Sequence, residues 1–316
     1  MAQTGSPDRP VAVLDDPAWF GAVMGSGGTA IVASMLPGRI EFLTAVGDVT
    51  AVLLLVASVA VFIGLCIRDF LVKRLGRGLG DRLRSPRSGP AYATIPGAVN
   101  VLAVGVINVW PVTMSTAVGW GVLVALATVG TFLGLWLTVA FFVAAFEHEQ
   151  FPAQDISGIW FIPETVVLLG SVLFARLATT GPAAAQRGLE VLAAALLGAG
   201  GLLFGLTAVI FVNRLVLHPG VHRTGAPAMW IMISPLAVTS LALQSIARAD
   251  QTLGGSWTSA MQEVATFGAA ALWGFALWWI AAAAVITRHA GRAALTYTPA
   301  DNDSDFEKDR AAVTPS

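Results

Sequence analysis

The chain has 316 residues, of which 56% are hydrophobic and only 12% are charged. Soluble domains carry roughly 25% charged residues, so this composition excludes an ordinary soluble protein and favours a membrane protein. The net charge of −1 argues against a nucleic-acid partner. The single cysteine, Cys66, excludes an intrachain disulfide.

Long apolar runs follow one another along the chain, and several exceed the 18 residues typical of a membrane-spanning helix. We predict helices over residues 19–36, 49–67, 91–109, 120–146, 157–178, 189–217, 228–246 and 257–287. The predicted fold is an all-α polytopic membrane protein with about eight transmembrane helices. Residues 17–290 form its membrane domain. A polar segment, 1–16, precedes this domain, and residues 291–316 have the composition of a disordered polar tail.

The basic residues predict the orientation of these helices. If the N-terminus is cytoplasmic, 14 of the 18 Lys and Arg residues fall in cytoplasmic segments, seven of them between residues 68 and 87. Only Arg39, Arg176, Arg187 and Arg248 remain outside. The positive-inside rule therefore places both termini in the cytoplasm. Arg far outnumbers Lys, which indicates a bacterial protein, so we expect a multi-pass protein of the bacterial inner (plasma) membrane.

An internal repeat divides the predicted helices into two kinds. The first, third, fifth and seventh helices each carry a helix-weakening element in their first half, centred on Gly27, Pro96, Pro163 and Pro235. These positions lie 69, 67 and 72 residues apart, and the even helices contain no proline. The pattern predicts four parallel helical hairpins, each with one kinked and one regular helix. Broken helices in transporters line the substrate path, so we expect the odd helices to line a central pore.

Five stretches resemble one known family. Residues 19–28 are similar to the opening helix of the tellurite-resistance/dicarboxylate transporter family, which includes the plant slow anion channels. Residues 94–96, 160–163 and 226–235 resemble its third, fifth and seventh helices, and residues 272–279 resemble its eighth. The resemblance covers about residues 17 to 289 and depends on the order and spacing of these stretches.

This resemblance implies ten helices in five hairpins, a pore lined by the odd helices, and a homotrimer. It also implies an anionic substrate: a C4-dicarboxylate such as malate, sulfite, or an inorganic anion such as nitrate or chloride, with tellurite also named. A fifth hairpin would have its broken stretch near residue 305, where the sequence instead has Asp303, Ser304 and Asp305. The phenylalanine that plugs the family's pore has no counterpart here. We therefore expect the fifth hairpin to be missing.

The candidate substrate path comprises small or helix-breaking residues together with two larger side chains. Small residues would keep the path wide and let the backbone approach an ion. The larger side chains are Phe161, which either narrows the path or simply packs, and Glu164. The full set is Gly25, Gly27, Gly28, Pro96, Gly97, Phe161, Pro163, Glu164 and Pro235.

Glu164 is the one acidic residue in the predicted fifth helix. A charged side chain at the centre of a spanning helix costs about 2.5 to 3.5 kcal/mol on insertion scales, so such residues usually face a bundle interior or a wet cavity. Glu164 is therefore the candidate for a proton-coupling carboxylate; alternatively, it lies near the interface beside a packing kink. Arg176, near the outer end of this helix, either recruits anions or pairs at the interface.

Three functions remain open at this point. The first is membrane transport of small anions, either as a proton-coupled carrier or as a channel. The alternative is a non-transporting membrane scaffold or regulator that lost its last hairpin. We expect no enzyme, because no nucleophile–base pair is visible, and we predict no catalytic residue, metal site or cofactor. Expected partners are a small anion, the lipid bilayer and further copies of the chain.

The glycine pairs Gly130/Gly134 and Gly201/Gly205 have the spacing that is typical of close contacts between membrane helices.

Overall fold

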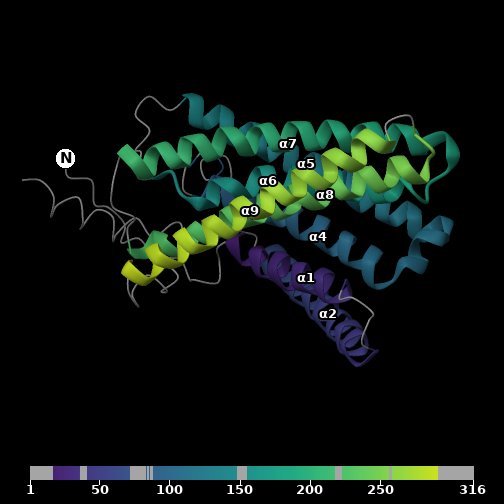
Figure 1. The fold of residues 1–316 in the computed structure, drawn as a ribbon. Helices are drawn as coiled ribbons and strands as arrows, with labels where there is room; N and C mark the ends of the chain where they lie inside the picture. Colours follow the sequence, from purple (N-terminus) through teal and green to yellow (C-terminus); the bar gives the residue numbers. More distant parts are fainter. Residues whose placement is uncertain are drawn as a thin grey trace, which may run out of the picture.

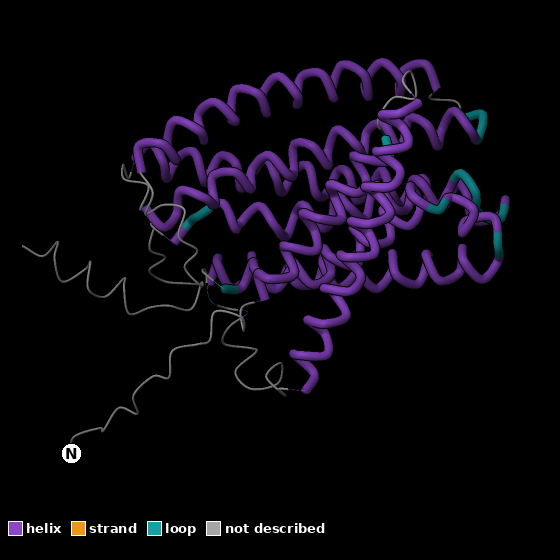
Figure 2. The backbone as a smooth tube through the Cα atoms, turned by 90° about the horizontal axis from the view of Figure 1, so that it is seen from below, coloured by secondary structure: helices purple, strands orange, loops and turns teal. Residues whose placement is uncertain are grey.

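The computed structural model describes residues 17–35, 41–71, 83, 85, 88–147, 155–217, 223–255 and 258–290 (Figure 1). Its long helices are α1 (Phe20–Ser34), α2 (Glu41–Leu71), α4 (Thr94–Val109), α5 (Ala117–Glu147), α6 (Ile162–Ala178), α7 (Ala183–Leu217), α8 (Ile233–Thr252) and α9 (Thr258–Ala290). Short 3-10 helices are η2 (Pro17–Trp19), η4 (Gly89–Ala93), η5 (Pro111–Ser115), η7 (Gly158–Phe161) and η8 (Arg223–Met232). Figure 2 shows only helices and short connections in these ranges. The predicted end segments, 1–16 and 291–316, lie outside the described residues.

Seven of the described helices are long and apolar enough to cross a membrane. The remaining predicted helix, 19–36, corresponds to α1, which is 15 residues long and, even with the 3 residues of η2, is shorter than the roughly 20 residues of a full span. In the sequence Pro37 and Gly38 follow soon after α1, and such a pair favours a turn. α2 and α7 instead begin earlier than predicted, because a helix satisfies its own backbone hydrogen bonds beyond the apolar run that hydropathy detects. The all-α polytopic fold is confirmed.

The helices form an inner and an outer layer in strict alternation. The inner helices are the more buried ones. The buried share of their most apolar 18-residue stretch is 72% in α4, 89% in α6 and 44% in α8. For the outer helices the buried share is 17% in α2, 39% in α5, 28% in α7 and 17% in α9. Each inner helix packs on the outer helix that follows it, and α1, α4, α6 and α8 contact one another in that order. The predicted four-hairpin repeat is therefore present in the structure.

The inner helices form an arc with two free ends. α6 lies in the middle of this arc and contacts α4, α5, α7 and α8. α1 and α8 are its ends, and no extensive interface joins them within the described part of the chain. In Figure 1, α1 and α2 also diverge from the body formed by α5 to α9. α6 is thus the most deeply buried of the three inner spans α4, α6 and α8.

Small residues let the two layers approach closely around α6. A Cβ atom on Gly200 of α7 would lie 2.8 Å from Cγ of Leu168, and one on Gly134 of α5 would overlap Val166. Gly130 likewise lies against Asn100 of α4. The predicted contact at Gly130 and Gly134 is therefore confirmed. Gly201 and Gly205, by contrast, have no neighbour within 4 Å in the described chain; Gly200 makes the contact instead.

Each inner helix begins with a 3-10 segment: η2 before α1, η4 before α4, η7 before α6 and η8 before α8. Pro163 is the second residue of α6, and Pro96 and Pro235 are the third residues of α4 and α8. The prolines therefore lie in first helical turns, where the missing N–H would have no intrahelical partner. The break is a junction between 3-10 and α geometry rather than a bend in a continuous helix. The Ile159 carbonyl, which Pro163 cannot bond, accepts from the Ile162 N–H instead.

The 3-10 segments gather at one end of the bundle, which we call the turn end. η2 contacts η4, η4 contacts η7, and η7 contacts η8. The Thr94 hydroxyl donates to the Pro17 carbonyl at 2.8 Å, and the Trp279 indole N–H donates to the Met229 carbonyl at 2.8 Å. The inner helices consequently all point the same way, as the parallel repeat predicted.

Candidate functional site

Glu164 is the third residue of α6 and its side chain is completely buried. The carboxyl lies near its own backbone N–H and near the Thr207 hydroxyl of α7, although neither contact reaches the geometry of a full hydrogen bond. No cationic side chain forms an ion pair with it among the described residues. The contact with Thr207 places Glu164 at the seam between the inner and outer layers. A buried carboxyl in such surroundings is far less costly when it is protonated and neutral.

Phe161, just before α6, lies in an aromatic cluster at the turn end. Its ring packs against Phe211 of α7 at a centroid distance of 5.3 Å and against Phe204 at 5.8 Å. The other buried members of the cluster are Met229, Met232, Leu236, Ala276, Trp279 and Ala283. Of the two interpretations of Phe161, these contacts favour packing between η7, η8 and the outer helices.

The predicted small residues fall into two groups. Gly27 and Gly97 are packing contacts, because a Cβ atom would lie 2.7 Å from Val101 at the first and 2.8 Å from the Met24 sulfur at the second. A Cβ atom at Gly25 or Gly28 would have no neighbour within 4 Å in the described chain, so α1 presents open space at these two positions. The three prolines, Pro96, Pro163 and Pro235, are buried in the first turns of their helices.

Polar contacts between helices add residues that the sequence did not single out. The Asn100 amide of α4 is buried and donates to the Val166 carbonyl of α6 at 3.3 Å. The hydroxyls of Ser26 and Ser58 lie 2.6 Å apart and join α1 to α2. The sequence could have pointed to these residues, because each is a polar side chain inside an apolar run, as Glu164 is. Such polar groups hold helices together where lipid supplies no hydrophobic driving force between them.

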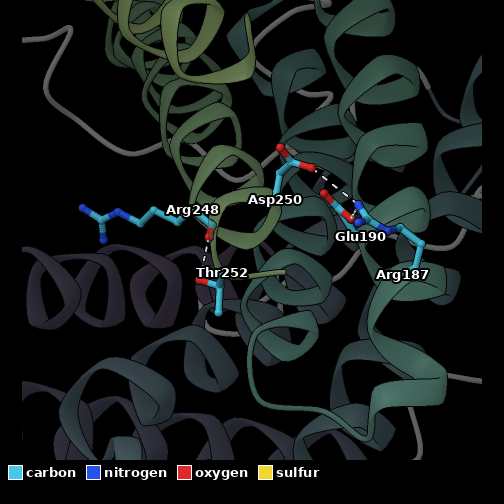
Figure 3. Close-up of polar contacts among 5 residues, drawn as sticks. All are labelled: Arg187, Glu190, Arg248, Asp250 and Thr252. Atoms are coloured by element: carbon cyan, nitrogen blue, oxygen red, sulfur yellow. Dashed lines mark hydrogen bonds and ion pairs between the residues drawn. The ribbon is translucent and has the colours of Figure 1, made fainter. Parts of the chain in front are cut away.

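Charged side chains gather at the end opposite the turn end. Arg176, in the last turn of α6, lies close enough to Arg248 of α8 for their charges to repel. Neither guanidinium forms an ion pair within the described ranges. Nearby, Arg187 and Glu190 of α7 meet Asp250 of α8 (Figure 3).

No group of three or more His, Cys, Asp or Glu side chains that could hold a metal ion occurs in the part of the chain that the structure describes. The structure instead defines a polytopic helical membrane protein whose inner helices break at one end. Such broken helices are typical of transporters and channels, where freed backbone groups lie in the protein interior.

Comparison with known proteins agrees with this class. A family model described as a voltage-dependent anion channel, SLAC1, matches residues 16–307, and the chain belongs to this family. This confirms the resemblance seen in the sequence. An uncharacterized transporter of Methanocaldococcus jannaschii is 27% identical over 279 residues, covering 86% of this chain and 74% of the relative. A second uncharacterized transporter of that organism is 24% identical over 274 residues, covering 85% of this chain and 74% of the relative.

Proposed function

We propose that the protein carries small anions across the bacterial plasma membrane along the inner helices. Membership of an anion channel family supports transport of anions in general. The candidate substrates remain C4-dicarboxylates such as malate, sulfite, and inorganic anions such as chloride. Both termini are proposed to lie in the cytoplasm, which puts the turn end on the cytoplasmic side.

The convergence of the four 3-10 segments is the observation that carries this proposal. Each helix N-terminus has a partial positive charge of about +0.5, and the N-termini of α1, α4, α6 and α8 all face one end. Such ends favour negative charge without a fixed cation that would hold an ion tightly. Weak binding suits conduction, because the ion must also leave.

Arg176 and Arg248 would act at the other end of the path. Two guanidiniums without carboxylate partners in the described structure raise the local concentration of anions there. α1 contributes open space at Gly25 and Gly28. The proposed path runs between these two ends along the concave side of the arc.

Glu164 is the proposed proton-coupling residue. In its protonated form it does not repel an anion, and it can release its proton only when water or a base reaches the seam between α6 and α7. Its complete burial and its lack of an ion-pair partner in the described region support this role. A passive channel would have no need of this proton.

Anion flux into proteoliposomes tests the proposal, with malate, sulfite and chloride measured with and without a pH gradient. We expect Glu164→Gln to abolish gradient-driven flux and Glu164→Asp to retain it. Glu263→Gln is the matched control, since it removes an exposed carboxylate on α9. Flux that is insensitive to the gradient and to Glu164→Gln would indicate a channel. No flux of any anion from folded protein would refute transport and favour the scaffold, which the open arc between α1 and α8 would suit.

A further inference from the structure

Two buried carboxyl groups share one guanidinium where α7 meets α8. Nη1 of Arg187 lies 2.5 Å from Oε2 of Glu190 and 3.4 Å from Oδ1 of Asp250. The side chains of Glu190 and Asp250 are completely buried, whereas that of Arg187 is 53% exposed. Figure 3 shows the three side chains converging from two helices, with both carboxyls directed at the same nitrogen.

The charges of this cluster do not balance if both carboxyls are ionised. Two carboxylates and one guanidinium would leave a net charge of −1 in a site where neither carboxylate reaches water. Oε1 of Glu190 and Oδ2 of Asp250 accept no full hydrogen bond from the described residues, although the two carboxyl groups interact with each other. Carboxyls at close range in a buried site cannot both be ionised at little cost, so the nearby Asp250 carboxylate disfavours ionisation of Glu190.

No other described group supplies the missing positive charge. The charged residues that α6, α8 and α9 also carry at this end are Arg176, Arg248 and Glu263, and none forms an ion pair with the cluster. Figure 3 shows Arg248 pointing away from Asp250. Among the described residues, the charges that act on Glu190 are those of Arg187 and Asp250.

The end of α8 is shaped to cover this site. Gly254 has φ = 61°, a conformation that other residues rarely adopt, and it turns the chain back after the helix. The Gly255 N–H then donates to the Asp250 carbonyl at 2.9 Å. Any side chain at Gly255 would overlap Oδ1 of Asp250. The turn therefore lies directly against the carboxyl and helps to keep water away from it.

We propose that Arg187, Glu190 and Asp250 form a proton-binding site that joins α7 to α8. With a proton on Glu190, its carboxyl O–H donates to the Asp250 carboxylate, and Arg187 neutralises the remaining charge. When the proton leaves to water, two buried carboxylates repel each other across the contact between the third and fourth hairpins. This repulsion weakens the contact between α7 and α8. Because α8 is an inner helix and also carries Arg248, a shift of α8 changes the lining of the proposed path. Proton binding itself does not rest on the proposed transport function; only its effect on flux does.

Thermal unfolding of the purified protein between pH 5 and 9 tests the site directly. Besides the proton of Glu164, which the wild type and the variants below share, the site holds one proton that the unfolded carboxyls release. This second proton makes rising pH favour unfolding by up to about a further tenfold in the equilibrium per pH unit. Gln at position 190 is neutral and has an N–H that can donate to Asp250. We therefore expect Glu190→Gln and Asp250→Asn to flatten this pH dependence and to exceed the wild type in stability at high pH. Glu263→Gln, the matched control, should follow the wild type.

The proposal fails if Glu190→Gln and Asp250→Asn lose stability in parallel with the wild type across the whole pH range. Should either variant not fold, infrared spectroscopy of the protonated carboxyl band gives a second measurement in protein with native Glu190 and Asp250. It is made in the Glu164→Gln background so that Glu164 does not contribute. A band that disappears as pH rises supports the site, and no such band refutes it.

Flux separates this proposal from the transport proposal. If the protein transports anions, Glu190→Gln should shift the pH dependence of flux when pH is varied on the Arg187 side, and Glu263→Gln should not. If no form transports anions, the unfolding and infrared results still decide whether the proton site exists. A normal pH profile of flux together with the predicted unfolding behaviour would refute only the link to the path.

Discussion

Glu164, Glu190 and Asp250 are three completely buried acidic side chains in one apolar bundle, and they are held in different ways. Among the described residues, Glu164 lies near the Thr207 hydroxyl and its own N–H and forms no ion pair, so burial disfavours its charged form. Glu190 and Asp250 instead share Arg187. Glu164, which has no ion-pair partner among the described residues, and the cluster at Arg187 lie towards opposite ends of α7.

Packing at the residue scale can be tested with two adjacent glycines of α7. A methyl group at Gly200 would meet Leu168 at 2.8 Å, whereas one at Gly201 would meet nothing within 4 Å. We expect Gly200→Ala to destabilise the protein by about 1–3 kcal/mol through overpacking. Gly201→Ala should be neutral or slightly stabilising, because alanine favours the helix. Unfolding midpoints measured in one detergent give the comparison, and equal midpoints would contradict the close contact of α6 with α7.

At the scale of the element, the four 3-10 segments explain how prolines occur at the starts of the inner helices without disrupting them. Pro163 occupies a position where an N–H would have no partner within the helix, and the Ile159 carbonyl is bonded by Ile162 instead. The junction is therefore a stable local structure. Its cost is small enough for it to recur in η4–α4 and η8–α8.

Replacement of Pro163 by Ala should separate the structural role of this junction from its role in transport. We expect Pro163→Ala to change stability by less than about 1 kcal/mol, since alanine can adopt the same backbone conformation. Leu168→Pro, in the interior of the same helix, should cost about 3 kcal/mol or more. If the junction lies in the anion path, Pro163→Ala will reduce flux while the protein stays folded. Full flux in Pro163→Ala would remove the junction from the path.

At the scale of the whole molecule, the parallel arrangement of the inner helices gives the two ends of the bundle different electrostatic characters. The turn end presents helix N-termini, and the opposite end presents Arg176, Arg248 and the Arg187 cluster. Alternation of inner and outer helices leaves the apolar surfaces of α2, α5, α7 and α9 for lipid or for neighbouring copies of the chain. Function on this scale depends on which end faces the cytoplasm.

The orientation predicts the accessibility of engineered cysteines. With Cys66 replaced by Ser, a single cysteine added at the N-terminus or the C-terminus should react with a membrane-impermeant thiol reagent only after cells are lysed. A cysteine in place of Thr180, between α6 and α7, should react in intact cells. Labelling of either terminus in intact cells would reverse the orientation inferred from the positive-inside rule.

Much of this architecture followed from local features of the sequence. Apolar runs, four regularly spaced helix-weakening elements and the order of the family's stretches predicted helices, hairpins and the alternation of two helix types. These features are local because bilayer thickness fixes the length of a span and proline acts within one turn. Hydropathy could not find where α2 and α7 begin, because their first turns continue beyond the apolar run.

Only the tertiary structure decided which side chains meet. It placed Glu164 beside Thr207, made Gly200 rather than Gly201 the contact with α6, and brought Glu190 to Asp250, 60 residues further along the chain. Sequence alone could not supply these pairs, because the rotation of each helix about its axis is set by packing against its neighbours. The sequence determined that the protein is a repeat of broken and regular membrane helices, and packing determined where its buried charges lie.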